Sequence, residues 1–210
     1  MRLIITTKLK KSTTSTRIII STVGIGLILG LSALLVLSSL QNLPSAIAQA
    51  STCQGVPATI VGTPGDDVLS GTSGRDVIAA LEGDDEVRGL GGNDLICGDD
   101  GRDRLFGDAG NDDMFGGDDN DVVRGGGGSD NVEGDTGNDV VRGDAGNDEM
   151  EGDTGDDRMI GGSGNDEMEG DTGSDNLNSI DGVVDNDSLD GGTGTDTCSS
   201  DPDPEDDCER

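Results

Sequence analysis

The sequence predicts an all-β fold, a solenoid of stacked short strands, and two observations carry the prediction. A nine-residue unit, G-[GDT]-x-G-[NDS]-D-x-U-x with U apolar, recurs about fifteen times between Gly62 and Ser199. Each unit sets a glycine-rich acidic turn beside a strand-like piece with one apolar side chain. A period this short indicates that every unit stacks on its neighbours.

The units keep one register over residues 62–178. The next copy begins at Ser179 and has twelve residues, so it fits the pattern if residues 183–185 are an insertion. The last copy covers residues 191–199. The repeat region is therefore expected to be one continuous stack.

Position six is Asp in every copy and position eight is always apolar, which gives one column of carboxylates and one apolar core. The position-six residues are Asp67, Asp76, Asp85, Asp94, Asp103, Asp112, Asp121, Asp130, Asp139, Asp148, Asp157, Asp166, Asp175, Asp187 and Asp196. The position-eight residues are Leu69, Ile78, Val87, Ile96, Leu105, Met114, Val123, Val132, Val141, Met150, Met159, Met168, Leu177, Leu189 and Cys198.

Positions one and four are almost always Gly, with Ala80 and Ser179 as exceptions at position one and Asp119 at position four. Such glycines indicate backbone with φ above zero or backbone too crowded for a Cβ. Position five is mostly Asn, Asp or Ser. We expect left-handed backbone at position five, because Asn and Asp tolerate it best among the other residues.

The repeat region cannot be folded by its apolar residues alone, and its charge opposes folding. Residues 51–210 carry all 44 acidic residues against eight arginines and no lysine, a net charge of −36. Stacked units would place equivalent Asp residues about 4.8 Å apart, where each pair repels by roughly 1 kcal/mol even in water. A cation must therefore lie between them.

The available ligands favour Ca²⁺ as that cation. Carboxylates and turn carbonyls are hard oxygen donors, and flexible turns can supply the six or more that Ca²⁺ takes. The chain has no His and no paired CxxC among its four Cys, so zinc and copper sites lack support. Mg²⁺ prefers a tight octahedron and keeps its waters, and no stretch fits an EF-hand loop.

The repeats resemble the G-G-x-G-x-D-x-U-x nonapeptides of the RTX (haemolysin-type) calcium-binding proteins over about two-thirds of the chain. The resemblance implies a parallel β-roll in which two nonapeptides make one rung of eighteen residues. It also implies Ca²⁺ between stacked turns, held by position-six Asp residues and turn carbonyls of copies n and n+2, which allows up to about thirteen ions. The pattern departs at residues 80–82, at Asp119 and at the insertion 183–185, so we expect weaker sites there.

Charged residues at the strand positions seven and nine independently favour a rung of two copies. The arginines there lie only in odd-numbered copies: Arg88, Arg104, Arg124, Arg142 and Arg158. The glutamates lie in even-numbered copies, with Glu86 as the exception: Glu133, Glu149, Glu151, Glu167 and Glu169. If alternate copies form opposite sheets, one sheet carries arginines outside and the other a glutamate ladder. Duplication of an eighteen-residue unit explains the same pattern.

The N-terminus predicts export. Five basic residues up to Arg17 precede an uncharged apolar stretch over residues 18–40, followed by small-x-small cleavage sites that end at Ala48 and Ala50. We therefore assign residues 1–50 to a signal peptide. The stretch is also long enough to remain as a transmembrane anchor. Either way the repeats would lie outside the membrane, secreted or anchored on the outer face of the cell membrane.

All four cysteines lie in the exported part, and an even number there favours disulfides. Three pairings are open. We favour Cys53–Cys97, which would tie an N-terminal cap segment (residues 51–61) to the first rungs of the repeat domain (62–199). The other favoured bond, Cys198–Cys208, would fold the acidic tail (200–210) over the last rung, although Cys198 could instead be a free buried thiol.

These features predict an exported calcium-ion-binding protein rather than an enzyme. The chain lacks His, Tyr and Trp, and it has no G-x-S-x-G or H-E-x-x-H motif. Its charge opposes nucleic-acid binding, and it would meet a membrane only through an uncleaved N-terminal segment. The alternative is a Ca²⁺-dependent structural or adhesive protein with a cell-surface or polysaccharide partner, and a polysaccharide-acting enzyme is a remote third. Such an acidic chain should be disordered without Ca²⁺ and fold when the ions bind.

Overall fold

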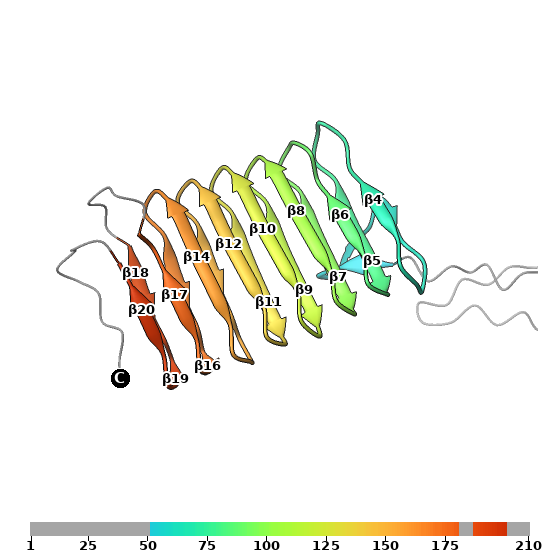
Figure 1. Ribbon diagram of the computed structural model, residues 1–210. Coiled ribbons are helices and arrows are strands. Elements are labelled where there is room, and N and C mark those ends of the chain that lie inside the picture. The colour runs from blue at the N-terminus through green and yellow to red at the C-terminus, as the bar shows by residue number, and fades with distance from the viewer. Residues whose placement is uncertain (1–50, 181–186, 201–210) are drawn as a thin grey trace, which may run out of the picture. The chain divides into compact units, whose positions relative to one another are not determined.

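A computed structural model describes residues 51–180 and 187–200 (Figure 1). The chain divides into two compact units, residues 1–47 and 48–210, and all described residues belong to the second. Every regular element of the described residues is a β-strand. The predicted signal peptide, most of the acidic tail and the insertion 183–185 lie outside the described residues.

One face of the second unit is an eight-stranded parallel sheet made by the odd-numbered copies, which we call the arginine sheet. Its order, from the C-terminal end, is β20-β17-β14-β12-β10-β8-β6-β4. The strands are β4 (Val68–Ser70), β6 (Glu86–Arg88), β8 (Arg104–Ala109), β10 (Val122–Gly127), β12 (Val140–Ala145), β14 (Arg158–Ser163), β17 (Asn176–Asn178) and β20 (Thr197–Ser199).

The opposite face is a second eight-stranded parallel sheet, which we call the glutamate sheet. Its order is β18-β15-β13-β11-β9-β7-β5-β3. The strands are β3 (Ile60–Val61), β5 (Val77–Glu82), β7 (Leu95–Asp100), β9 (Asp113–Asp118), β11 (Asn131–Thr136), β13 (Glu149–Glu151), β15 (Glu167–Glu169) and β18 (Ser188–Asp190). Two short strands, β16 (Thr172–Gly173) and β19 (Thr193–Gly194), pair in parallel within the last turns.

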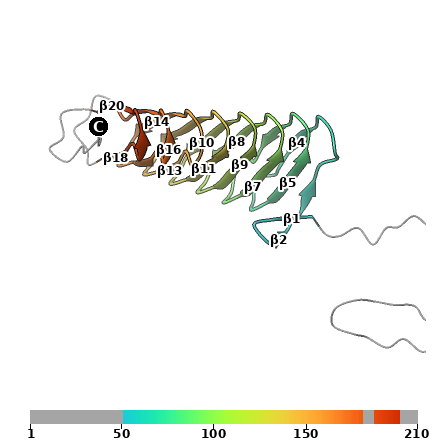
Figure 2. The same ribbon diagram turned by 90° about the horizontal axis from the view of Figure 1, so that it is seen from below.

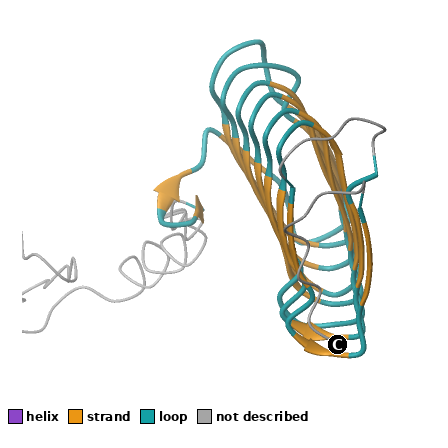
Figure 3. Cartoon of the chain, turned by 90° about the vertical axis from the view of Figure 1, so that its left-hand side faces the viewer, coloured by secondary structure: helices purple, strands orange, loops and turns teal. Residues whose placement is uncertain are grey.

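Strand pairing confirms two copies per rung. Val123 of β10 is paired with Val141 of β12, eighteen residues later, and the same spacing holds through both sheets up to the insertion. Across the insertion the spacing becomes 21 residues, as in the pair Met168 and Leu189, so the three extra residues leave the register intact. The chain is therefore a parallel β-roll of about seven turns, with the two sheets facing each other (Figure 3).

The core is a single layer of position-eight side chains between the two sheets. From Ile78 to Leu189 these side chains are at most 2 % exposed, whereas Leu69 and Cys198 at the two ends are only partly buried. Each strand contributes one such side chain because alternate residues face outward. The core is thus thin, and the rungs depend on interactions between turns as well as on apolar burial.

The two glycine positions have different causes. At position one the neighbours exclude a Cβ: one placed on Gly98 would lie 2.3 Å from an Asp103 carboxylate oxygen and 2.3 Å from the Gly116 carbonyl. At position four the backbone has positive φ in most described copies, as at Gly128 (φ 141°). Asp119, which replaces Gly at this position, also has a positive φ (80°).

The expectation of left-handed backbone at position five is wrong, because no position-five residue in the described range has positive φ. Position two has it instead. Six Asp residues and two Leu residues are left-handed there: Leu81, Leu90, Asp99, Asp108, Asp135, Asp144, Asp153 and Asp171.

A short antiparallel hairpin covers the N-terminal end of the glutamate sheet (Figure 2). Its strands are β1 (Thr52–Cys53) and β2 (Val56–Pro57). The predicted Cys53–Cys97 disulfide is present, and around it Val77, Leu95 and the half-buried Phe115 form a small second core. Cys198 is also disulfide-bonded rather than free, while its predicted partner Cys208 lies outside the described residues. Within the described residues no helix is long and apolar enough to span a membrane.

Candidate metal-binding turns

The turns between strands form two stacks, one on each edge of the roll, and every turn ends in a position-six Asp. The stack that leads into the arginine sheet contains Asp67, Asp85, Asp103, Asp121, Asp139, Asp157, Asp175 and Asp196. The stack that leads into the glutamate sheet contains Asp76, Asp94, Asp112, Asp130, Asp148, Asp166 and Asp187. The structure therefore brings all the predicted site residues into two columns.

These carboxylates are buried and hold successive rungs together through one oxygen. The backbone N–H of Asp121 donates to Oδ1 of Asp139 at 2.7 Å, and the N–H of Asp139 donates to Oδ1 of Asp157 at 2.7 Å. The same bond links each described position-six pair, at 2.6–3.0 Å. From Asp76 to Asp187 these residues are at most 7 % exposed.

The second carboxylate oxygen is buried and receives no hydrogen bond in most copies. Among the described residues this holds for Oδ2 of Asp85, Asp94, Asp103, Asp112, Asp121, Asp130, Asp139, Asp148, Asp157 and Asp175. Buried polar atoms are nearly always paired, and a buried charge without a partner is costly. Two columns of such oxygens, rung above rung, fit a row of hard cations.

The raised pKa values of the position-six Asp residues also favour a cation between the rungs. Burial is the largest cause that raises the pKa of Asp121 to about 8, and the neighbouring carboxylates, Asp103 and Asp139 among them, add to it. The same causes raise the pKa of Asp103 and Asp139 to about 7. In the other stack, burial raises the pKa of Asp112 and Asp130 to about 6. A cation between the rungs would remove this penalty on the ionised forms.

In the first two copies the second oxygen is satisfied from within its own turn. Thr63 and Thr72 at position two donate their backbone N–H and hydroxyl groups to Oδ2 of Asp67 and Asp76, at 2.6 and 2.9 Å. Later copies carry Leu, Gly or Asp at position two up to Asp171. The first two turns therefore have internal donors in place of a cation, which the ten turns with an unpaired Oδ2 named above lack.

Position five forms a second ladder, which sequence reasoning missed. The N–H of Asn138 donates to Oδ1 of Asn120 at 2.9 Å, and equivalent bonds join Asn111 to Asn93 and Asn165 to Asn147. These bonds run back to the preceding rung, whereas the position-six bonds run forward. The preference for Asn, Asp and Ser therefore comes from a side-chain acceptor rather than from backbone conformation.

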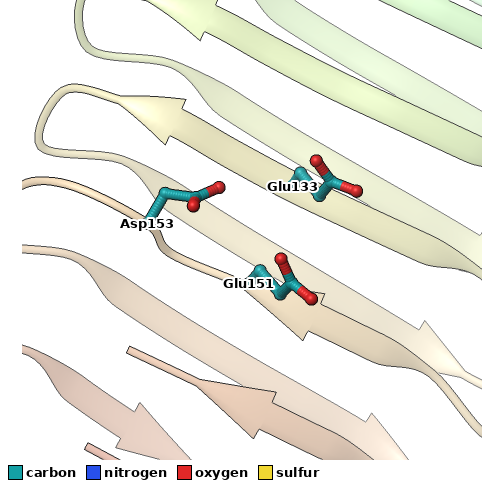
Figure 4. A group of neighbouring side chains, drawn as sticks. All are labelled: Glu133, Glu151 and Asp153. Carbon is teal, nitrogen blue, oxygen red and sulfur yellow. The ribbon is translucent and has the colours of Figure 1, made fainter. Parts of the chain in front are cut away.

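The position-two Asp residues are a further feature that the sequence did not single out. On the arginine side they form ion pairs with arginines of the sheet. Asp108 Oδ1 lies 2.6 Å from Arg88 Nη2, and Asp144 pairs with Arg124. On the glutamate side Asp153 lies beside Glu133 and Glu151, with carboxylate oxygens of all three within 4.8 Å of one another (Figure 4). Burial is the largest cause that raises the pKa of Glu133 to about 7. The recurrence of Asp at position two in six copies is the sequence signal that could have marked them.

The fold and its turns together define a calcium-binding β-solenoid. The family model of the RTX calcium-binding nonapeptide repeat matches the chain in four copies, over residues 61–96, 96–123, 124–159 and 142–177. These matches span more than half of the 210 residues, and the chain belongs to this family. No curated protein matches the chain significantly. RTX repeats imply calcium binding, and the stacked Asp columns agree with it.

Proposed function

We propose that this chain is an exported calcium-ion-binding protein whose repeat domain, residues 62–199, folds when multiple Ca²⁺ ions bind between its stacked turns. The observation that supports the proposal is the column of buried Oδ2 atoms with no hydrogen-bond donor. The Oδ1 atoms already join the rungs. The Oδ2 atoms are therefore the ones available to bind an ion. Because the chain belongs to a calcium-binding repeat family, we take that ion to be Ca²⁺.

The ligands would be the fifteen position-six Asp residues together with carbonyl oxygens of the same turns. Each ion would lie between copies n and n+2, and the copies allow up to about thirteen ions. The departures at Leu81 and Asp119 keep the left-handed backbone of their turns, so these turns retain the shape of the others. In the first rungs Thr63 and Thr72 compete with an ion for Oδ2.

Export is proposed from the signal-like N-terminus and is supported by the disulfide chemistry. Cys53 and Cys97 are joined, and disulfides persist in oxidising compartments outside the cytosol. RTX repeat proteins are typically secreted. Calcium outside the cell is also abundant enough to occupy weak sites. The cap segment 51–61 closes one end of the repeat domain, and the tail 200–210 follows the other.

A structural role at the cell surface is the second candidate, because the two outer faces of the roll carry opposite charges. It would use the same calcium-loaded fold. Fractionation of the producing cells separates the two roles: a soluble calcium-binding protein appears in the medium, and a surface component remains with the envelope.

Calcium-dependent folding tests the proposal. We expect residues 51–210 to give a coil-like far-UV circular dichroism spectrum without Ca²⁺ and a β-type spectrum when Ca²⁺ is added. The same concentrations of Mg²⁺ should leave the spectrum coil-like, since Mg²⁺ demands a tight octahedron and keeps its waters. A chain already folded and indifferent to Ca²⁺ would refute the proposal.

A further inference from the structure

The outer faces of the two sheets carry opposite charges. On the arginine sheet the outward positions seven and nine hold one acidic residue, Glu86, and five cations: Arg88, Arg104, Arg124, Arg142 and Arg158. On the glutamate sheet from β9 onward the same positions hold no cation in the described residues. They hold seven acidic residues: Asp113, Glu133, Glu149, Glu151, Glu167, Glu169 and Asp190.

The arginine face is only partly neutralised within the chain, because Arg88, Arg124 and Arg142 are ion-paired with two carboxylates of the same sheet, Asp108 and Asp144. Arg104 and Arg158 are exposed and form no ion pair in the part of the chain that the structure describes. On the other face Glu149 lies directly opposite Glu167, and Glu151 opposite Glu169. Like charges facing each other across strands are destabilising. Figure 4 shows the carboxylates of Glu133, Glu151 and Asp153 gathered on the same face.

The two charged ladders have the same period, because each rung contributes one strand to each sheet. Strands in both sheets are therefore spaced by about 4.8 Å, and a row of arginines on one copy can face a row of glutamates on another over several rungs. The hairpin β1–β2 packs on Val77, Leu95 and Cys97 of the glutamate sheet. The acidic part of that face begins where this cover ends.

The arginine face also offers apolar contact. Phe106, Val122, Val140 and Ile160 lie on its outer side between the arginines and are only partly buried. The guanidinium groups of Arg88 and Arg104 lie 5.7 and 5.8 Å from the centre of the Phe106 ring. An interface that combines apolar area with charges of one sign fits a partner face of the opposite sign.

We propose that the arginine face of one copy binds the glutamate face of a second copy of this chain. The two patches are different, so the contact is heterologous and each bound copy leaves one face of each kind free. Association would therefore continue into open-ended stacks of rolls. The proposal rests on the calcium-loaded fold, because the net charge of −36 of residues 51–210 would otherwise keep copies apart.

Sedimentation velocity of the exported protein in saturating Ca²⁺ tests this, with far-UV circular dichroism on the same samples. We expect species larger than the monomer, increasing with protein concentration, at about 20 mM NaCl, and dissociation at about 500 mM, where the Debye length falls to a few ångströms. A folded protein that stays monomeric at both salt concentrations overturns this inference and leaves the proposed function standing. A protein that Ca²⁺ does not fold overturns both.

Charge reversal at matched exposed positions identifies the faces. The double variant Arg104→Glu/Arg158→Glu leaves three arginines against three glutamates at positions seven and nine of the arginine face. Glu149→Arg/Glu167→Arg places two arginines among the five remaining acidic residues of the glutamate face, and all four substituted residues occupy position seven and are exposed. We expect each variant alone to associate much more weakly than the wild type, and a one-to-one mixture to associate at low salt through the unchanged face of each variant. Variants that associate alone as the wild type does, or a mixture that remains monomeric, would overturn the inference.

Neutral variants guard against misfolding of the reversed ones. Glu149→Gln/Glu167→Gln keeps the side-chain size, and Arg104→Gln/Arg158→Gln keeps the first three side-chain carbons while removing the charge. Each double variant should weaken self-association at least about tenfold, since exposed pairs contribute up to about 1 kcal/mol each and two are lost per contact. If the glutamate face binds Ca²⁺ ions instead of a second copy, the glutamate variant binds fewer ions while association is unaffected, and the inference fails.

Discussion

Gly128→Ala is expected to break the stack in the middle of the roll. Gly128 has φ of 141°, and a Cβ there would lie 1.8 Å from the carbonyl oxygen of Gly110 in the preceding rung. That oxygen belongs to backbone, so the two rungs must separate. Left-handed strain costs about 1–3 kcal/mol and overpacking about 1–3 kcal/mol more. Separated rungs would also lose a candidate ion site.

The neighbouring residue provides a matched control in the same turn. A Cβ on Gly127 would meet nothing closer than the Asp108 carbonyl oxygen at 3.9 Å, and Gly127 lacks positive φ. In saturating Ca²⁺, denaturant unfolding should show Gly127→Ala within about 0.5 kcal/mol of the wild type and Gly128→Ala lower by at least about 2 kcal/mol. Equal stability of the two variants would contradict the stacked geometry.

Without Ca²⁺, acid should favour the fold rather than oppose it. Burial raises the pKa of Asp121 to about 8 and those of Asp103 and Asp139 to about 7, whereas an unfolded Asp has a pKa near 3.9. Between these values the folded chain binds more protons than the unfolded chain, so its stability falls as pH rises. The contribution is complete below about pH 4 and is lost as pH passes through about 6 to 8.

Circular dichroism of calcium-stripped protein between pH 8 and 5 measures this effect, with light scattering to detect aggregation. We expect β-structure to increase toward pH 5. In the presence of Ca²⁺ the order reverses, because protonated carboxylates bind metal poorly. Asp121→Asn, which removes a carboxyl whose pKa burial raises to about 8, should reduce the acid-induced gain. A calcium-free chain with the same spectrum at pH 5 and pH 8 would contradict the burial of the Asp columns.

Much of the fold could be predicted because the core and the strand pairing follow the nine-residue repeat of the sequence. A one-residue shift of register would turn every side chain to the other face, so the regular apolar position eight fixed the core column from Ile78 to Leu189. Arginines in odd-numbered copies and glutamates in even-numbered copies indicated which copies share a sheet. The strand register, in which Arg124 lies beside Arg142 and Glu149 beside Glu167, confirmed it. The insertion near the C-terminus left that register intact.

Features that depend on contacts between rungs could not be predicted from one copy. The Asn and Asp residues at position five suggested backbone conformation, whereas their side chains accept hydrogen bonds from the next rung. Left-handed backbone belongs to position two, as at Asp135. Part of the crowding at Gly98, its contact with the Gly116 carbonyl, also arises from the next rung. The Asp ladder followed from the repeat, but three-dimensional geometry was needed to show that Oδ1 joins the rungs while Oδ2 receives no hydrogen bond in most copies.

A Ca²⁺ titration of the wild type beside Asp139→Ala and Asp196→Ala tests the central claim most directly, that position-six carboxylates hold the ions on which folding depends. Asp139 is 1 % exposed, accepts the Asp121 N–H at 2.7 Å and lies in mid-stack, whereas Asp196 is partly exposed in the last turn. Both substitutions leave an N–H of the preceding rung unpaired, that of Asp121 or that of Asp175, at a cost of about 1–3 kcal/mol. Asp139 would in addition be a ligand of ions on both of its sides, whereas Asp196 ends the stack and would bind on one side only. We predict that Asp139→Ala needs at least about tenfold more Ca²⁺ to fold, while Asp196→Ala needs a clearly smaller increase. Equal effects of the two substitutions, or folding of all three chains without Ca²⁺, would contradict the account.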